Sequence, residues 1–136
     1  MPLTGHCLCG HTTFTIDVNQ PDAVGYDHCD ACQRQTGSAF SLVAIVPREK
    51  LTIKGPIKAF KAKGDSGNDV TRIFCSDCGS PIAHQPDAAP EISAIKAGCF
   101  TKEIKQGLKP TLEIYCQDKL AFLTQKLEKP FDGMPK

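Results

Sequence analysis

Short runs of hydrophobic and β-branched residues recur along the chain, and turn residues separate them. The runs are rich in Val, Ile, Thr and Phe, and stretches such as Gly64–Asn68 and Gln85–Pro90 lie between them. This pattern is typical of β-strands joined by turns, not of long amphipathic helices. The sequence therefore predicts a mainly β fold, with strands at Thr12–Asp17, Val24–Asp27, Phe40–Val46, Ile57–Ala62, Val70–Phe74, Ile82–Gln85, Glu91–Ala97 and Leu112–Cys116.

Helix is predicted in only two short stretches. Ala31–Gln35 and Thr101–Gln106 are each long enough for one or two turns. The last residues, Glu128–Lys136, contain two prolines and a glycine, which predict a loose C-terminal tail. Because there is no internal repeat and no long linker, residues 1–136 are predicted to form a single domain. The cysteine pairs predict that this domain binds zinc.

Composition and charge narrow the class of function. The net charge of +1 and the isoelectric point near 7.6 argue against electrostatic binding to nucleic acid or to an anionic membrane. The longest apolar run, Leu42–Val46, is too short to span a bilayer. The first residues lack the basic flank and apolar run of a signal peptide. We therefore expect a cytoplasmic protein with no nucleic-acid or membrane partner.

The eight cysteines of the chain are the main candidates for functional side chains. In a reducing compartment, clustered cysteines bind metal more often than they form disulfides. Six of them form three close pairs, whereas Cys99 and Cys116 stand alone in apolar surroundings and are predicted to be small core residues. The pairs are Cys7 with Cys9, Cys29 with Cys32, and Cys75 with Cys78.

The spacing within the pairs suits metal binding. Two cysteines three positions apart place both sulfurs on one side of a tight loop, where each can reach one ion at about 2.3 Å. Gly79, directly after Cys78, allows the backbone to turn sharply there. In a strand, Cys7 and Cys9 would point to the same face. Two such pairs make a closed tetrahedral thiolate site, which is typical of structural zinc.

Spacing alone leaves the assignment of the pairs open. The two Cys-x2-Cys pairs could share one ion, as in a zinc ribbon, and the first pair would then have no partner. Alternatively, Cys7 and Cys9 could join Cys75 and Cys78 in a closed site. In that case Cys29 and Cys32 belong to a second site that is short of ligands.

Three motifs together resemble a known family. They are Gly-His-Cys-Leu-Cys-Gly at 5–10, His-Cys-Asp-Ala-Cys-Gln-Arg-Gln-Thr-Gly-Ser-Ala-Phe at 28–40, and Arg-Ile-Phe-Cys-Ser-Asp-Cys-Gly-Ser-Pro-Ile at 72–82. In order and neighbours they resemble the glutathione-dependent formaldehyde-activating enzyme family, which includes the centromere protein V domain. The resemblance implies a β-tent fold of small antiparallel sheets built around zinc. It also implies a structural zinc held by Cys7, Cys9, Cys75 and Cys78.

The chain departs from the family's second motif, which reads Cys-x-Cys-x2-Cys. Cys29 and Cys32 match its last two cysteines, and Asp27 stands at the first. Asp27 shares a strand face with Cys29, and carboxylate is an accepted zinc ligand. The resemblance therefore implies a catalytic zinc held by Asp27, Cys29 and Cys32. The alternative is a solvated aspartate and a weak or absent second metal. Carboxylate donates less charge than thiolate, so we expect a more Lewis-acidic but more labile ion.

The resemblance also implies a reaction. In the family, the sulfur of glutathione adds to formaldehyde to give S-hydroxymethylglutathione, a carbon–sulfur lyase reaction in reverse. A zinc with an open position would favour the thiolate of an incoming substrate. Arg34 is a candidate partner for a glutathione carboxylate, but its position in the sequence favours a solvated surface residue. The second class of function is a non-catalytic, zinc-stabilised β module that binds a partner.

Overall fold

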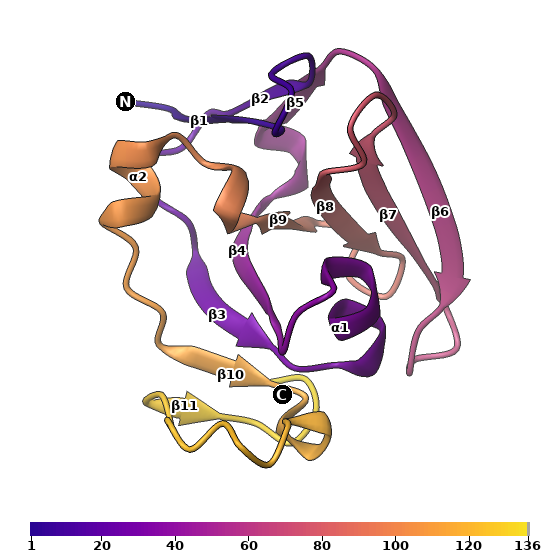
Figure 1. Ribbon diagram of the computed structural model, residues 1–136, viewed down its shortest axis with the longest axis vertical. Coiled ribbons are helices and arrows are strands. Elements are labelled where there is room, and N and C mark those ends of the chain that lie inside the picture. The colour runs from indigo at the N-terminus through magenta and orange to yellow at the C-terminus, as the bar shows by residue number, and fades with distance from the viewer. Residues whose placement is uncertain (136) are drawn as a thin grey trace.

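The chain folds into two β-sheets that share one hydrophobic core (Figure 1). The computed structural model describes residues 1–135. The smaller sheet is antiparallel, in the order β1-β2-β5, with β1 at Leu3–His6, β2 at Thr13–Ile16 and β5 at Leu51–Lys54. In β2 exposed threonines alternate with the buried Phe14 and Ile16, as expected of a strand with one face on the core.

The larger sheet contains eight strands in the order β11-β10-β3-β4-β9-β8-β7-β6. Neighbours are antiparallel from β3 to β6, whereas β10 runs parallel to both β3 and β11. The edge strand β6 is exposed along its whole length, and its lysines discourage pairing with other chains. The strands are β3 Ala23–Asp27, β4 Ser41–Pro47, β6 Ile57–Lys63, β7 Asp69–Cys75, β8 Pro81–Pro86, β9 Ile92–Lys96, β10 Leu112–Ile114 and β11 Lys129–Pro130.

The helices are short. Helix α1, Asp30–Thr36, begins after Cys29, whose sulfur accepts the backbone N–H of Cys32, and it ends at Gly37 in the left-handed conformation. Figure 1 shows α1 between the β3–β4 and the β7–β8 parts of the sheet, above β10 and β11 in this view. The remaining helical segments are α2 at Lys102–Gln106 and the 3-10 turns η1 at Arg48–Lys50, η2 at Ala97–Cys99 and η3 at Cys116–Asp118.

The core lies where the smaller sheet packs on β4, β8 and β9 of the larger one. Apolar side chains from both sheets contact one another there, and Phe14 meets Phe100 with ring centroids 5.8 Å apart. Cys7 and Cys75 belong to this same buried cluster. The first cysteine group is therefore attached directly to the core.

The prediction of a mainly β fold is confirmed. All eight predicted strands and both helical segments occur, with ends that differ by at most two residues. The sequence does not predict β1, β5 and β11, because each has at most four residues and depends on pairing with other strands. One sheet is also larger than the small antiparallel sheets expected, and it includes parallel pairs.

The C-terminal segment differs from the predicted loose tail over its described part, residues 128–135. The N–H of Phe131 donates to the Glu113 carbonyl at 2.8 Å, and the N–H of Cys116 donates to the Phe131 carbonyl at 2.9 Å. The N–H of Tyr115 donates to the Gly133 carbonyl at 3.1 Å. The prolines do not prevent this docking, because carbonyl groups of the segment accept hydrogen bonds from Tyr115, Cys116 and Gln117, and its non-proline N–H groups donate to the carbonyls of Glu113 and Thr111.

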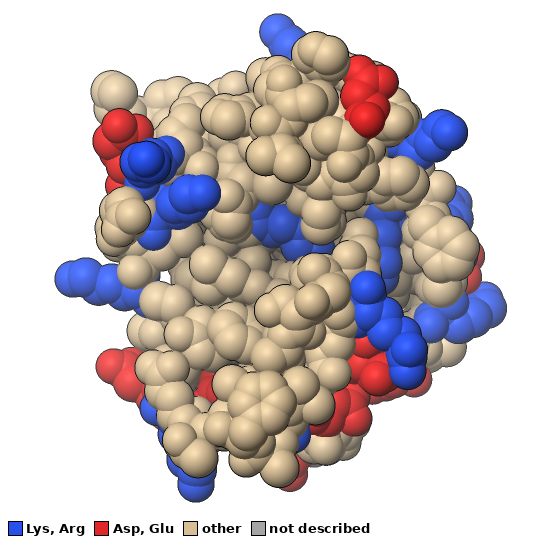
Figure 2. Space-filling view, viewed as in Figure 1, with Lys and Arg blue, Asp and Glu red and all other residues tan. Residues whose placement is uncertain are grey.

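The surface carries charges of both signs. On the face in Figure 2, Lys and Arg side chains are interspersed with Asp and Glu around the outline, and uncharged residues cover much of the middle. This distribution agrees with the low net charge and gives no broad basic area on that face. Within residues 1–135, no helix has the length and apolar character that crossing a membrane requires.

The Glu113 side chain fastens the stretch that precedes the C-terminal segment, at Lys119 and Leu127, to the sheet. Its carboxylate is buried, and it accepts hydrogen bonds from His28 Nε2 at 2.8 Å and Lys119 Nζ at 2.9 Å. The backbone N–H of Leu127 donates to its other oxygen at 2.8 Å. Burial alone would raise the pKa of Glu113, but these hydrogen bonds lower it to about 2.

This carboxylate makes folding stability depend on pH. A pKa lowered from 4.5 in the unfolded chain to about 2 in the folded one stabilises the fold above about pH 4.5, on the order of 3 kcal/mol. The contribution is lost as pH falls from 4.5 through 2. We expect Glu113→Gln to remove this part of the acid dependence in urea unfolding curves. The exposed Glu103→Gln is the control. An unchanged pH dependence in Glu113→Gln would contradict the assignment.

Candidate metal centres

The first centre joins the two sheets. Cys7 and Cys9 lie in the turn after β1 of the smaller sheet, and Cys75 and Cys78 lie at the end of β7 and in the turn after it. Each of the four residues offers a sulfur, and these four atoms all lie within 4.8 Å of one another. The Cys7–Cys9 pair is thus in a turn, not in a strand as the spacing suggested, but its sulfurs still converge.

The sulfur positions fit a tetrahedral ion. Cys7 Sγ lies 3.5 Å from Cys9 Sγ, and Cys9 Sγ lies 3.8 Å from Cys75 Sγ. Four sulfurs bound at about 2.3 Å to one zinc stand about 3.8 Å apart. All eight cysteines are free thiols, and 3.5 Å is far longer than a disulfide bond. Of the two pairings that spacing left open, these four cysteines are the ones that lie together.

The turns around the first centre are held by their own contacts. Gly79 adopts φ 79°, the left-handed conformation that the sharp turn after Cys78 requires. Ser80 Oγ accepts the N–H of Leu8 at 3.0 Å and lies 3.2 Å from Cys78 Sγ. Hydrogen bonds from the hydroxyl and the backbone of Ser80 lower the pKa of Cys78 to about 5. The Cys78 thiolate, the form that binds metal, therefore prevails at neutral pH.

A second group of possible ligands comes from three separate segments. Asp27 ends β3, Cys32 lies in α1, and His84 lies in β8. One ligand atom of each lies within 4.8 Å of the others, and Asp27 Oδ2 is 4.0 Å from His84 Nε2. Carboxylate, thiolate and imidazole are all ligands that zinc accepts. These residue types therefore fit a zinc held by three protein groups.

The structure brings together two of the three ligands implied for this centre and adds a different third. Asp27 and Cys32 belong to the group, whereas Cys29 stands at the start of α1 outside it. Asp27 Oδ1 accepts the N–H of Cys29 at 3.1 Å, and the Cys29 sulfur accepts the N–H of Cys32 at 3.2 Å. Cys29 lines the adjacent pocket instead.

His84 is the residue that sequence reasoning missed. It has no other ligand near it in the sequence, and it reaches Asp27 only because β8 pairs with β9, which pairs with β4 beside β3. Lys96 Nζ lies 3.1 Å from His84 Nδ1 and also donates to Ser41 Oγ at 2.9 Å. Burial, together with the charges of Lys96 and Arg72, lowers the pKa of His84 well below its usual value. The imidazole is therefore neutral, as a metal ligand must be.

Two cations flank the second centre. Arg72 Nη1 lies 3.6 Å from Cys32 Sγ and donates to Gln35 Oε1 at 2.8 Å, and Lys96 is buried beside His84. A hydrogen bond with Cys29 and the charges of Lys96 and Arg72 lower the pKa of Cys32 despite its burial. The same cations would repel a divalent ion. Their positions support the expectation that metal is held less tightly here than in the first centre.

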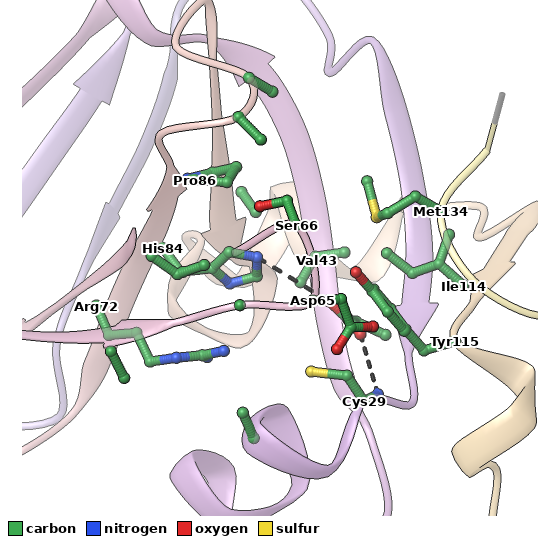
Figure 3. Close-up of a pocket in the computed structure, with 18 of the residues that line it drawn as sticks. Cys29, Val43, Asp65, Ser66, Arg72, His84, Pro86, Ile114, Tyr115 and Met134 are labelled. Carbon is green, nitrogen blue, oxygen red and sulfur yellow. Dashed lines mark hydrogen bonds and ion pairs between the residues drawn. The ribbon is translucent and has the colours of Figure 1, made fainter. Parts of the chain in front are cut away.

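A pocket of about 280 Å³ opens beside the second centre (Figure 3). Asp27, Cys29 and His84 line it, together with residues of β4, the β6–β7 turn and the C-terminal segment. Figure 3 shows Asp65 and the Tyr115 ring projecting into the pocket near Cys29, with Arg72 and His84 entering from the opposite side. Tyr115 is the one non-glycine residue within 1–135 that has positive φ, 55°, a strained conformation that often marks functional sites.

Arg34 does not line this pocket. Its side chain is exposed, and its Nε donates to Asp30 Oδ2 at 2.7 Å, one helical turn earlier in α1. The guanidinium is thus paired within its own helix, and nothing in its position directs it toward the second centre.

His28, Glu113 and Cys116 form a third group of possible ligands, also within 4.8 Å of one another. Here Glu113 already accepts hydrogen bonds from His28, Lys119 and Leu127. The ammonium of Lys119, 2.9 Å from the carboxylate, supplies the positive charge that a metal would bring. We therefore interpret this group as a structural contact of the C-terminal segment.

Comparison with known proteins shows the class to which this fold and these cysteine groups belong. The family model described as glutathione-dependent formaldehyde-activating enzyme matches residues 2–118. The chain therefore belongs to that family. Proteins that carry the family's name from Podospora anserina and Aspergillus flavus are 29% and 26% identical over 79 and 80 residues.

These matches cover 56% and 57% of this chain but only 36% and 40% of the two relatives. The matched part thus spans well under half of each relative's length. A crystal structure of a Rhodobacter sphaeroides protein shares the fold, with a TM-score of 0.59 and 17% identity, over 94% of this chain and 98% of that one.

We expect that substitution of one cysteine of the first centre removes the metal and lowers the stability of the fold together. We expect Cys75→Ser to remove one zinc per chain and to lower the melting temperature by more than about 10 °C, because a closed thiolate site stabilises the folded state directly. Metal analysis and thermal unfolding test this. Cys99→Ser, which changes a half-buried cysteine outside the group, should keep its zinc. Full zinc content in Cys75→Ser would refute the assignment.

The geometry of the second centre predicts that Cys32, and not Cys29, is a ligand of the second metal. We expect Asp27→Ala, Cys32→Ser and His84→Ala each to weaken the second metal at least about 10-fold, whereas Cys29→Ser should change its affinity less than about 3-fold. Cobalt titration followed by absorbance measures both effects. Mild chelation should remove the second ion before the first. A Cys29→Ser variant as defective as Cys32→Ser would favour the ligand set that the sequence implied.

Proposed function

We propose that this chain catalyses reversible addition of a thiol, glutathione or a related compound, to a small aldehyde such as formaldehyde. The observation that carries the proposal is the convergence of Asp27, Cys32 and His84 beside a pocket large enough for a small molecule. Membership of the family, whose name refers to glutathione and formaldehyde, supports the same reaction class. In this proposal the first centre is structural and the second is catalytic.

The reaction needs no oxidant or reductant. A bond forms between the thiol sulfur and the aldehyde carbon, the carbon–oxygen π bond breaks, and the thiol proton ends on the aldehyde oxygen. The reverse direction cleaves the carbon–sulfur bond and returns thiol and aldehyde. Zinc held by Asp27, Cys32 and His84 would supply the Lewis acidity that favours the thiolate form of the substrate at neutral pH.

The protein groups around the pocket have distinct roles in this proposal. Lys96 and Arg72 hold His84 and Cys32 in place through the contacts given above. The apolar residues of the pocket exclude water from the thiolate. Burial and the nearby carboxylate of Asp65 raise the pKa of Tyr115 to about 12, so its hydroxyl stays protonated and can donate a hydrogen bond to the aldehyde oxygen as charge develops there.

Adduct formation tests the proposal. The experiment uses the zinc-loaded chain, ¹³C-labelled formaldehyde and a panel of thiols that includes glutathione. By NMR we expect the S-hydroxymethyl adduct (a hemithioacetal) to exchange with free formaldehyde faster when the protein is present than when it is absent. Tyr115→Phe should lower the rate at least about 10-fold, because one donor to the oxygen is lost. Tyr26→Phe, which changes a tyrosine stacked on Phe40, is the matched control.

If no thiol in the panel exchanges faster with protein present, the enzymatic proposal fails. The chain would then be better described as a zinc-stabilised β module, and the pocket as a binding site without chemistry.

A further inference from the structure

The Arg72 guanidinium enters the pocket beside the second centre (Figure 3). Arg72 lies in β7 directly opposite His84 of β8, so the two side chains share one face of the sheet. Its Nη1 lies 3.6 Å from the sulfur of Cys32, which belongs to the candidate ligand set. Strand register therefore places a permanent positive charge next to the point where a substrate thiol would bind.

The protein engages only one end of this guanidinium. Nη1 donates to Gln35 Oε1 at 2.8 Å and contacts the Cys32 sulfur. Within residues 1–135, Nε and Nη2 have no hydrogen-bond acceptor, and no carboxylate lies within ion-pair distance of Arg72. Neither atom is fully enclosed by protein. Nε and Nη2 form the edge with which arginine holds a carboxylate through two parallel hydrogen bonds, so that edge is available to a ligand.

The other cations that could serve this purpose already have partners. Lys63, which also lines the pocket, has an exposed ammonium group 3.4 Å from Asp69 Oδ1. Arg34, the residue that the sequence offered for a glutathione carboxylate, lies outside the pocket and is paired with Asp30 at 2.7 Å. Among the described residues that line the pocket, Arg72 is thus the one cation without a carboxylate partner.

Partial burial strengthens the attraction of Arg72 for an anion. The residue is only partly accessible to solvent, and a charge in such a place gains more from an opposite charge than an exposed one does. The aspartates that line the pocket besides Asp27 are Asp30, Asp65 and Asp118, and all three are exposed. Solvent screens their charges, so they offset little of this attraction.

We propose that Arg72 binds a carboxylate of the thiol substrate through Nε and Nη2, and that in glutathione this is the glycine carboxylate. The inference rests on the function proposed above and adds the residue that selects a carboxylated thiol. Because the guanidinium lies beside a ligand candidate of the second centre, the carboxylate nearer to the substrate sulfur is the one within its reach. In glutathione, fewer bonds separate the sulfur from the glycine carboxylate than from the glutamyl carboxylate.

Glutathione and its glycine monoethyl ester, which lacks that negative charge, test the inference by direct binding. Calorimetric titration of the zinc-loaded chain measures both dissociation constants without relying on turnover. We expect the ester to bind the wild-type chain at least about 10-fold more weakly than glutathione, because the paired hydrogen bonds to a charged acceptor are lost. Equal affinities would overturn the inference and leave the proposed function intact. If neither ligand binds, the inference fails, and the exchange assay with the thiol panel decides the proposed function separately.

Substitution of Arg72 assigns the effect to this residue. Arg72→Gln should weaken glutathione binding at least about 10-fold and change binding of the ester less than about 3-fold, so the difference between the two ligands disappears. Arg34→Gln removes an arginine that is paired outside the pocket, and it should change neither affinity. If Arg72 served only to hold Cys32 and Gln35 in place, Arg72→Gln would weaken both ligands equally, and that result would overturn the inference.

Arg72→Lys replaces Arg72→Gln if the latter fails to fold or to retain its metal. Lysine keeps the positive charge but lacks the planar fork of the guanidinium, so we expect glutathione to bind about 3- to 10-fold more weakly than to the wild-type chain. Binding of the ester should stay unchanged. An equal loss of affinity for both ligands in Arg72→Lys would contradict the proposed contact.

Discussion

The rest of the structure depends on the convergence of four cysteine sulfurs between the two sheets. Cys7 and Cys9 follow the first strand of the smaller sheet. Cys75 ends β7, next to the edge strand of the larger sheet, and Cys78 lies in the turn after it. A shared ion at this point would fix the relative position of the sheets and the core between them, with Cys7 and Cys75 already part of that core. A domain of this size with many short strands gains much from such a cross-link, because each short strand is marginal alone.

The larger sheet brings a second set of distant segments together, away from the first centre. Asp27, Cys32 and His84 come from a strand end, a short helix and a third strand, and their arrangement depends on the register of β3, β4, β9 and β8. The buried Lys96 and the partly buried Arg72 compensate the negative charge of this group. The first centre is a closed set of four thiolates, whereas the second has three mixed ligands, adjacent cations and a pocket. That contrast is the physical basis for proposing a structural role for the first centre and a catalytic role for the second.

The C-terminal segment is part of this second site. Its backbone pairs with that of Glu113, Tyr115 and Cys116, and the Glu113 carboxylate holds the preceding stretch through Lys119 and Leu127. The strained backbone at Tyr115 places its ring in the pocket, where Asp118 of η3 and Met134 of the C-terminal segment also lie. Both the side chain proposed to contact the substrate oxygen and part of the pocket wall thus depend on residues that composition alone would assign to a loose tail.

The sequence by itself determined the features that rest on local spacing. Hydrophobic runs and turn residues predict the eight longer strands, since burial of one or both faces sets the pattern within each strand. Cysteine pairs predict the first centre, because two sulfurs close in sequence can reach the same ion wherever the loop lies. Only the tertiary structure decided the features that depend on contact between distant segments. It brought His84 and Asp27 together through strand register, left Cys29 beside the group, docked the C-terminal segment and built the pocket from distant segments. No local pattern carries that information, because a one-residue change in strand register would turn Asp27 or His84 to the other face of the sheet.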